Sequence, residues 1–421
     1  MKRICFFNIV LTILLVFNSC SEDGRLREAL PESVHVSSER LNRIDTMLLQ
    51  SIENKLIAGA VGFIARDGKI IYNRSFGVSD LENKIPMRTD NIFRIASQTK
   101  AITTIGLMML FEEGKFLLDD PISKYIPEFA HPQVIDKFNE KDSTFTSVPS
   151  RREITIRDLL THTSGIGYTG IGTPEMKAVY AKAGLKGGLG NDKVTIGDDI
   201  KLLGRQPLFH QPGERFTYGL NLDVIGYLIE ILSGQKLDQY FKQHIFEPLG
   251  MVDTWFYLPE DKHGRLVKLN TEGADHLVSS MPQSLYNYPL SKGIYFAGGA
   301  GLSSTTKDYA IFLQMLLNKG EYNGKRLLSS RTVELITSNQ IGDLNLGVDK
   351  FGLGFQITTE RGQSVLGISE GSFAWGGIFG TIYWADPKKK LVCLLYLQQY
   401  PLSHSEIQNK FKAMVYQTLT D

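Results

Sequence analysis

The sequence predicts an α+β fold, an α/β sandwich in which an antiparallel sheet is flanked by helices. Strand patterns lie near both ends of the chain: a hairpin signal at 60–72, and strand-like runs in Phe373–Trp384 and Leu391–Leu397. The residues between them carry helical stretches and long loops rich in glycine and proline. We therefore expect a sheet-containing part at about 37–112 and 296–421, with a mostly helical part at about 113–295 inserted.

Three helices support this arrangement. Leu41 to Leu56 carry apolar residues at helical spacing behind two serine caps, and a last helix covers about 403–419. Residues 97–112 are apolar on nearly every face, which is typical of a buried helix, and Gly114 is a suitable residue to end it. The chain therefore has helices that can flank the sheet and one helix that can be buried inside the protein.

Charge excludes one class of function. The 421 residues include 46 lysines and arginines against 45 aspartates and glutamates, and no long block of like charge occurs. A protein that binds nucleic acid needs a basic face, so no nucleic-acid partner is expected.

The N-terminus has the features of an export signal. Lys2 and Arg3 precede an apolar run at 4–17, which is shorter than the roughly 20 residues that span a bilayer as a helix. Cys20 follows a small residue and precedes a polar stretch, which resembles a bacterial lipoprotein signal. A plain signal peptide with an incidental cysteine is the alternative.

The lipoprotein interpretation divides the chain into three parts. Residues 1–19 would be the signal peptide, 20–36 a polar tether, and 37–421 the folded domain. Cys20 would be lipidated, placing the protein in the bacterial cell envelope, on the periplasmic or outer-membrane surface. Cys5 would leave with the signal, so the remaining Cys393 would have no disulfide partner and is expected to be an inert core thiol.

A Ser-x-x-Lys pattern occurs three times, so context must choose among the copies, which are Ser97/Lys100, Ser233/Lys236 and Ser304/Lys307. The second copy follows an apolar helix and the third precedes one, so both are expected to be helix caps. Only Ser97 starts a buried helix.

That placement suits nucleophilic catalysis. Residues three apart share a helix face, so Lys100 is expected beside the Ser97 hydroxyl. Burial disfavours a charged ammonium, and a neutral lysine takes the proton that serine does not release unaided near neutral pH. The helix N-terminus also offers free N–H groups to a developing oxyanion. An ordinary N-cap serine beside a solvated lysine is the alternative on the tetrapeptide alone.

Longer stretches resemble the serine β-lactamase and penicillin-binding-protein superfamily, in the branch of class C β-lactamases and family VIII carboxylesterases. The similarity runs from about residue 37 to 420. The matching stretches, in order, are FRIASQTKAIT (93–103), GKFLLDDPISKYIPEF (114–129), ITIRDLLTHTSGI (154–166), QPGERFTYGL (211–220), GGAGLSSTTKDYA (298–310) and FAWGGIFGTIYWADP (373–387). The resemblance implies a β-lactamase/transpeptidase-like fold with the active site between the two parts.

The resemblance also assigns roles to residues. Ser97 would be the acyl-accepting nucleophile, Lys100 its activating partner, and Tyr218 the tyrosine that exchanges protons with the serine and the leaving group. The backbone N–H groups of Ser97 and Ile378 would form the oxyanion hole.

The same comparison places Trp375, Gly376 and Gly377 along the substrate cleft, on an edge strand. The two glycines would let a substrate approach the backbone closely.

Two departures bear on the substrate. Class C β-lactamases carry Tyr-x-Asn, but Leu220 stands at the third position here and Asn221 comes one residue late. The lysine of their Lys-Thr-Gly, which attracts the substrate carboxylate, is replaced by Trp375. These losses match the esterase branch, so ester hydrolysis is favoured. A β-lactamase, a D-amino-acid peptidase or DD-carboxypeptidase, and an acyltransferase remain alternatives.

Other classes have less support. His162 is expected to be structural, no histidine spacing suits a metal site, and no cofactor is expected. A binding module that has lost catalysis is a distant alternative. Substrate contacts would come from the loops at 130–150, 167–200 and 255–295, and both the natural substrate and the oligomeric state stay open.

Overall fold

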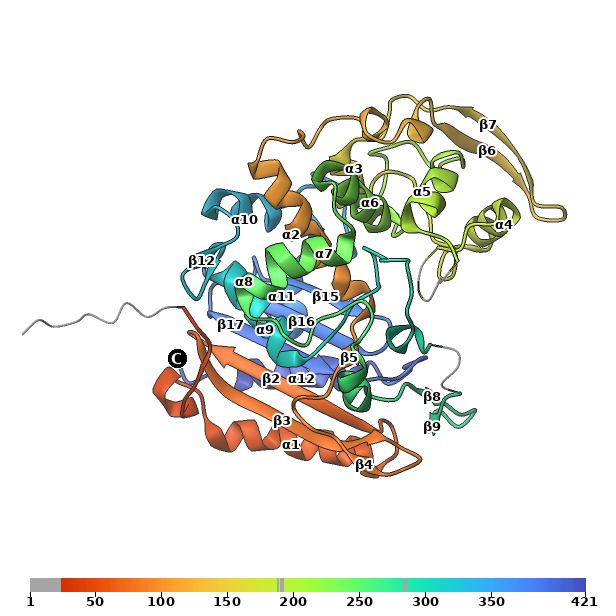
Figure 1. Ribbon diagram of the computed structural model, residues 1–421. Helices are drawn as coiled ribbons and strands as arrows, with labels where there is room; N and C mark the ends of the chain where they lie inside the picture. Colours follow the sequence, from red (N-terminus) through yellow and green to blue (C-terminus); the bar gives the residue numbers. More distant parts are fainter. Residues whose placement is uncertain (1–23, 188, 190–192, 283–285) are drawn as a thin grey trace, which may run out of the picture.

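The computed structural model describes residues 24–187, 189, 193–282 and 286–421 (Figure 1). The predicted signal peptide and Cys20 lie outside these residues. Within them, no helix has both the length and the apolar character needed to cross a membrane.

One sheet forms the centre of the fold (Figure 1). Its strands lie side by side in the order β1 (Arg27–Glu28), β3 (Lys69–Asp80), β2 (Gly59–Arg66), β17 (Leu391–Tyr396), β16 (Thr381–Asp386), β15 (Phe373–Gly377), β14 (Gln356–Ile357) and β13 (Lys350–Phe351), and β4 (Ile85–Pro86) also pairs with β3. All neighbours are antiparallel except β1 and β3. Val61 pairs with Tyr396, so strands from both ends of the chain are joined directly. The predicted fold class is confirmed.

Alternate residues of the sheet face two separate cores. On β17, Val392, Leu394 and Tyr396 enter one core, and Cys393 and Leu395 enter the other. This alternation follows from the two-residue period of a strand that is buried on both faces. Cys393 is a free, fully buried thiol, and burial raises its pKa, so it is inert as predicted.

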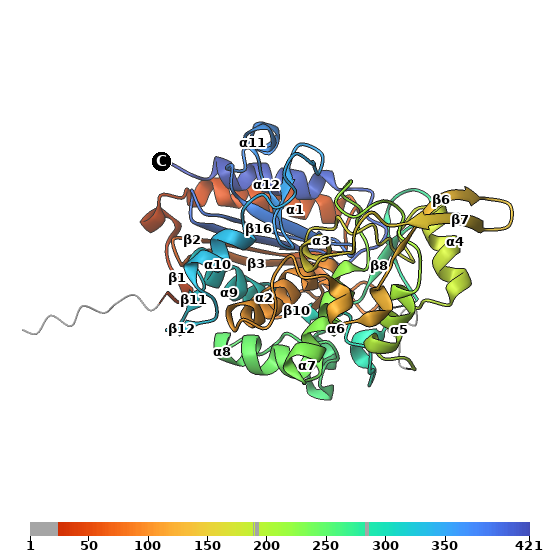
Figure 2. The same cartoon turned by 90° about the horizontal axis from the view of Figure 1, so that it is seen from above.

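Helices cover both faces (Figure 2). One face carries α1 (Ser38–Glu53) and α12 (Glu406–Gln417), which pack on the sheet around Trp384 and Phe411. The other face carries α2 (Thr99–Glu112), α6 (Asn221–Ser233) and α9 (Thr306–Leu317). The sheet is therefore the middle layer of a sandwich.

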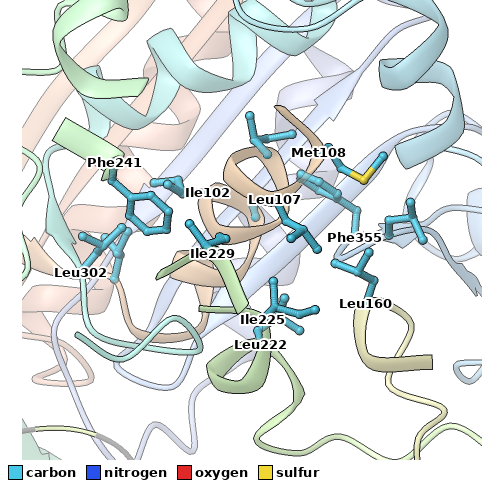
Figure 3. Close-up of a cluster of buried hydrophobic side chains, with 14 of the residues drawn as sticks. Ile102, Leu107, Met108, Leu160, Leu222, Ile225, Ile229, Phe241, Leu302 and Phe355 are labelled. Carbon is cyan, nitrogen blue, oxygen red and sulfur yellow. The ribbon is translucent and has the colours of Figure 1, made fainter. Parts of the chain in front are cut away.

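Helix α2 is the interior helix. Its side chains Ile102 and Leu107 pack against Ile225 and Ile229 of α6 (Figure 3). Gly106 of α2 also lets the ring of Phe241 pack closely on this helix, because a Cβ there would lie 2.9 Å from that ring. The packing of α2 on α6 brings together segments that are far apart in the sequence, and the site described below depends on it.

The remaining helices and strands are short. The helices are α3 (Ile156–Leu160), α4 (Pro174–Ala183), α5 (Ile196–Gly204), α7 (Leu237–Phe241), α8 (Glu247–Leu249), α10 (Ser330–Ile336) and α11 (Glu360–Leu366). The strands form four pairs outside the central sheet: β5 (Phe93–Arg94) with β10 (Ser303–Ser304), β6 (Gln133–Asn139) with β7 (Thr144–Pro149), β8 (Asn270–Glu272) with β9 (Val278–Ser280), and β11 (Glu321–Tyr322) with β12 (Lys325–Arg326).

The structure corrects three expectations. The predicted tether is folded from β1 onward, because β1 pairs with β3 and Val36 is buried. The predicted loop at 130–150 is the β6–β7 hairpin. The predicted run Phe373–Trp384 is two strands, because Gly380 adopts a φ of 86° in the turn between them.

Candidate active site

Ser97 lies in a strained turn between β5 and α2. A single 3-10 turn, Ala96–Gln98, leads into the helix, and Ala96 has a φ of 43°, which costs energy for a residue with a Cβ. The turn is fixed from both sides: Tyr309 donates to the carbonyl of Gln98 at 2.8 Å, and Tyr396 donates to its side chain at 2.6 Å. The surrounding core thus imposes the strain that presents Ser97.

Lys100 lies one turn further along and is only 1% exposed. Its Nζ is 3.4 Å from the Oγ of Ser97 and donates to the carbonyl of Gly299 at 2.6 Å. No carboxylate of the described residues forms a direct ion pair with it. The predicted pairing of Ser97 with Lys100 is therefore present in the geometry.

Tyr218 completes the group. Its ring lies 4.6 Å from the Nζ of Lys100, and the ring of Tyr168 lies 5.6 Å from the same atom and stacks on Tyr218. Gly219 permits the segment that carries Tyr218 to pack closely on the segment that carries Tyr168. A Cβ at Gly219 would lie 2.1 Å from the carbonyl oxygen of Ile166. The buried hydroxyl of Tyr218 has no hydrogen-bond partner among the described residues, which leaves it available to a substrate.

The ring of His162 packs against the ring of Tyr218. The two rings are 4.8 Å apart, and the Nδ1 of His162 accepts from the backbone N–H of Gly219 and lies 2.8 Å from the side-chain nitrogen of Asn221. Burial, with the charge of Lys100 as a second cause, holds the pKa of His162 well below its usual value, so the ring is neutral. This geometry agrees with the predicted structural role.

Both polar atoms of the Asn221 side chain have partners within the protein. Its side-chain oxygen accepts from the hydroxyl of Ser164, while its nitrogen faces His162. Leu220 is buried. The amide that a Tyr-x-Asn motif would offer to a substrate is therefore absent, as the sequence predicted.

Strand β15 forms the opposite wall. The ring of Trp375 lies 5.6 Å from Tyr218 and 5.3 Å from Phe351, which forms an aromatic cluster. Gly377 lies against the turn of the nucleophile, because a Cβ there would come within 2.4 Å of the carbonyl oxygen of Ile95. The glycine thus permits β15 to approach Ser97.

Two backbone groups at this junction are free. The N–H groups of Ser97 and Ile378 donate no hydrogen bond to any residue that the structure describes. They belong to adjoining segments, the turn before α2 and the turn after β15. Free donors of this kind suit an oxyanion.

A groove of about 390 Å³ adjoins this junction. Its lining consists of neutral residues from β15, β16 and the turn between them, from the segment before α12 and from the first turn of α12: Gly376, Gly377, Ile378, Gly380, Thr381, Ile382, Tyr400, Pro401, Leu402, Ser405 and Gln408. Because this described lining has no charged side chain, the groove suits an uncharged group.

The other Ser-x-x-Lys copies are structural. The hydroxyl of Ser233 donates to the carbonyl of Ile229 at 2.7 Å, and Lys236 pairs with Glu230. Ser304 lies in the short strand β10, and its hydroxyl forms a hydrogen bond with the hydroxyl of Thr254. Neither copy faces the site.

The sequence interpretation missed Tyr168 and Asp223. Asp223 is 2% exposed, in the first turn of α6, and its Oδ1 accepts from the N–H of Gly299 at 3.1 Å. Burial raises its pKa to about 6, against the opposing effect of Lys100. The available signal was a single charged residue within the apolar run 222–229. Tyr168 had none.

Comparison with known proteins adds family evidence. Residues 44–415 match the beta-lactamase family. Esterase EstB of Burkholderia gladioli is 28% identical over 379 residues, which cover 84% of this chain and 89% of that protein. A putative D-alanyl-D-alanine carboxypeptidase of Escherichia coli (strain K12) is 28% identical over 416 residues, covering 91% of this chain and 86% of the other.

The solved structures agree. EstCE1, described as a hydrolase with promiscuous acyltransferase activity, superposes with a TM-score of 0.75 at 25% sequence identity. The match covers 90% of this chain and 98% of the EstCE1 chain. The similarity therefore extends over nearly the whole described domain.

Proposed function

The chain belongs to the beta-lactamase family, and on that premise we propose that it is a serine carboxylesterase that works through an acyl-enzyme on Ser97. The family consists of serine hydrolases, with esterase, acyltransferase and DD-carboxypeptidase relatives of this chain. The observation that carries the choice of ester is the aromatic contact of Trp375 with Tyr218 at the position of the lysine of the Lys-Thr-Gly motif. Trp375 stands where a lysine would attract a carboxylate, and Asn221 is bound to His162 and Ser164.

The proposed acylation step uses the groups described above. The Oγ of Ser97 attacks the ester carbonyl carbon while its proton passes to Lys100, 3.4 Å away. The N–H groups of Ser97 and Ile378 stabilise the oxyanion. Tyr218, whose hydroxyl is free, transfers a proton to the leaving alcohol as the tetrahedral intermediate collapses.

Deacylation reverses these roles. A water molecule attacks the acyl carbon and gives its proton to the deprotonated Tyr218. Ser97 then leaves as the hydroxyl with the proton that Lys100 took from it during acylation. An alcohol in place of that water would make the same enzyme an acyltransferase. A neutral groove beside Ile378 supports an uncharged substrate portion there.

A comparison of substrates tests this proposal. We expect turnover of p-nitrophenyl butyrate and no appreciable turnover of nitrocefin or of a peptide ending in D-Ala-D-Ala. Those two carry a carboxylate, and Trp375 stands where class C β-lactamases have the lysine that attracts it. Turnover of nitrocefin alone would instead indicate a β-lactamase. Release of D-alanine alone would indicate a carboxypeptidase, and no covalent acylation of Ser97 by any of them would favour a binding module.

We also propose that the chain is a lipoprotein of the bacterial cell envelope, attached through Cys20. The support is the sequence alone: an apolar run at 4–17 followed by a cysteine and a polar stretch. Cys20→Ala is expected to move the protein from the membrane fraction to the soluble fraction and to abolish incorporation of labelled palmitate. Cys393→Ala is the matched control and should leave both unchanged. A Cys20→Ala protein that still takes up palmitate would contradict the assignment.

A further inference from the structure

A buried carboxylate is connected to the catalytic lysine through a single residue. Asp223 accepts from the N–H of Gly299 at 3.1 Å, and the carbonyl of the same Gly299 accepts from the Nζ of Lys100 at 2.6 Å. The contact is tight, because a Cβ on Gly299 would lie 2.4 Å from the Oδ2 of Asp223. The position of the carbonyl that holds Lys100 thus depends on Asp223.

Charge gives the same pair a second connection. An ammonium buried like that of Lys100 is costly unless an opposite charge compensates it. Lys100 has no direct ion pair among the described residues, but its charge acts on Asp223 and lowers the pKa of that carboxyl against the larger effect of burial. The attraction is mutual, since an ionised Asp223 and an ammonium on Lys100 carry opposite charges.

Other titratable groups also face this carboxylate. Asp199 of α5 repels the charge of Asp223. Asp199 itself accepts hydrogen bonds from the backbone N–H groups of residues 186 and 187 and from the hydroxyl of Tyr295. The phenols of Tyr168 and Tyr295 lie within the field of Asp223, and burial raises the pKa of each well above its usual value. They therefore stay neutral, and Lys100 is the cation that responds to Asp223.

We propose that Asp223 is a positioning residue that holds Lys100 through Gly299 and, as its buried counter-charge, sets the pH range in which Ser97 reacts. The inference rests on the roles proposed above for Ser97 and Lys100. The acylation step adds a proton to Lys100, and removal of the neighbouring carboxylate should move the pH dependence of Ser97 reactivity to lower pH.

The test follows the nucleophile directly, without a natural substrate. A fluorophosphonate probe is reacted with the mature protein between about pH 5 and pH 9, and the rate of Ser97 labelling is plotted against pH. Asp223→Asn keeps the size and the acceptor oxygen but removes the charge. We expect the acidic limb of its profile to lie about one pH unit below that of the wild type.

Matched variants separate charge from structure. Asp223→Glu keeps the charge and should retain the wild-type limb, even where the rate falls. Asp308 is the control: it is equally buried at 4% exposed, accepts from the N–H of Asp253 at 2.7 Å, and burial raises its pKa to about 6. Asp308→Asn removes a similar carboxylate elsewhere and should leave the limb where it is.

A second variant changes Gly299, the other partner in the contact with Asp223. Gly299→Ala keeps the carboxylate but places a methyl group where Asp223 Oδ2 lies, and its limb should also move to lower pH. Folding of each variant is checked by thermal melting. If folded Asp223→Asn and Gly299→Ala both keep the wild-type limb, the inference is wrong. If wild-type Ser97 is not labelled at any pH, the proposed function fails instead.

Discussion

Ser97→Ala is expected to lower ester turnover by roughly 10⁴-fold or more and to abolish covalent labelling, because no other group can form the acyl-enzyme. The fold should be unaffected. The hydroxyl of Ser97 makes one long contact, 3.4 Å from Lys100, and the turn is held instead by Gln98 and its tyrosine partners. The measurements are p-nitrophenyl butyrate turnover and mass spectrometry of the fluorophosphonate-treated protein.

Ser233→Ala is the matched control for that variant. It removes the hydroxyl from another Ser-x-x-Lys copy, where Ser233 donates to the carbonyl of Ile229 at the end of α6. It should be labelled at Ser97 and should turn over substrate at the wild-type rate. Substantial turnover that survives in Ser97→Ala would assign the nucleophile to another residue.

Lys100→Met is expected to cause the next largest loss, about 10³-fold in kcat/KM, because it removes the group that takes the serine proton. Methionine keeps most of the volume, so the packing of α2 changes little. Lys236→Met is the control, since Lys236 has the same spacing from its serine but pairs with Glu230. A Lys100→Met enzyme with nearly full kcat/KM would show that Tyr218 alone activates Ser97.

The same variant has a second expected effect, on stability. Without Lys100, Asp223 is a buried charge with no compensation, so the free energy of unfolding should fall by about 3 kcal/mol near pH 8. A carboxyl whose pKa is raised by folding binds more protons in the folded state, so this loss should shrink as the pH falls toward about 5. Lys100→Met with Asp223→Asn should recover most of the loss, and urea unfolding at the two pH values measures it.

The interior helix was predictable because its composition left no polar face. Ser97 was singled out for starting that helix, and Lys100 followed from helical spacing. Tyr218 was different: 120 residues lie between it and Ser97, so no local spacing could pair them, and only the resemblance did so. The structure gives the physical reason, which is the packing of α2 against α6, the helix that begins three residues after Tyr218.

The missed features share a cause: none of them has a hydrophobic pattern. Strand β7 of the β6–β7 hairpin is exposed along its whole length, so alternation of apolar and polar residues was absent. Strand β1 is two residues long, and its pairing with β3 depends on backbone groups that any sequence has. Asp223 became meaningful only once Gly299 was brought beside it from the loop before α9.

The sheet's connectivity has a consequence for how the active protein is made. Val61 pairs with Tyr396, so β2 has no partner on that side until the last strand has been synthesised. Contacts this distant in the chain form late, and folding of such a topology is slow. Within the central sheet, the strand that carries Trp375 is joined to β2 through β16 and β17. We therefore expect a chain that ends before Leu391, and so lacks β17, to contain Ser97 without a complete sheet behind β15 and to show no hydrolytic activity.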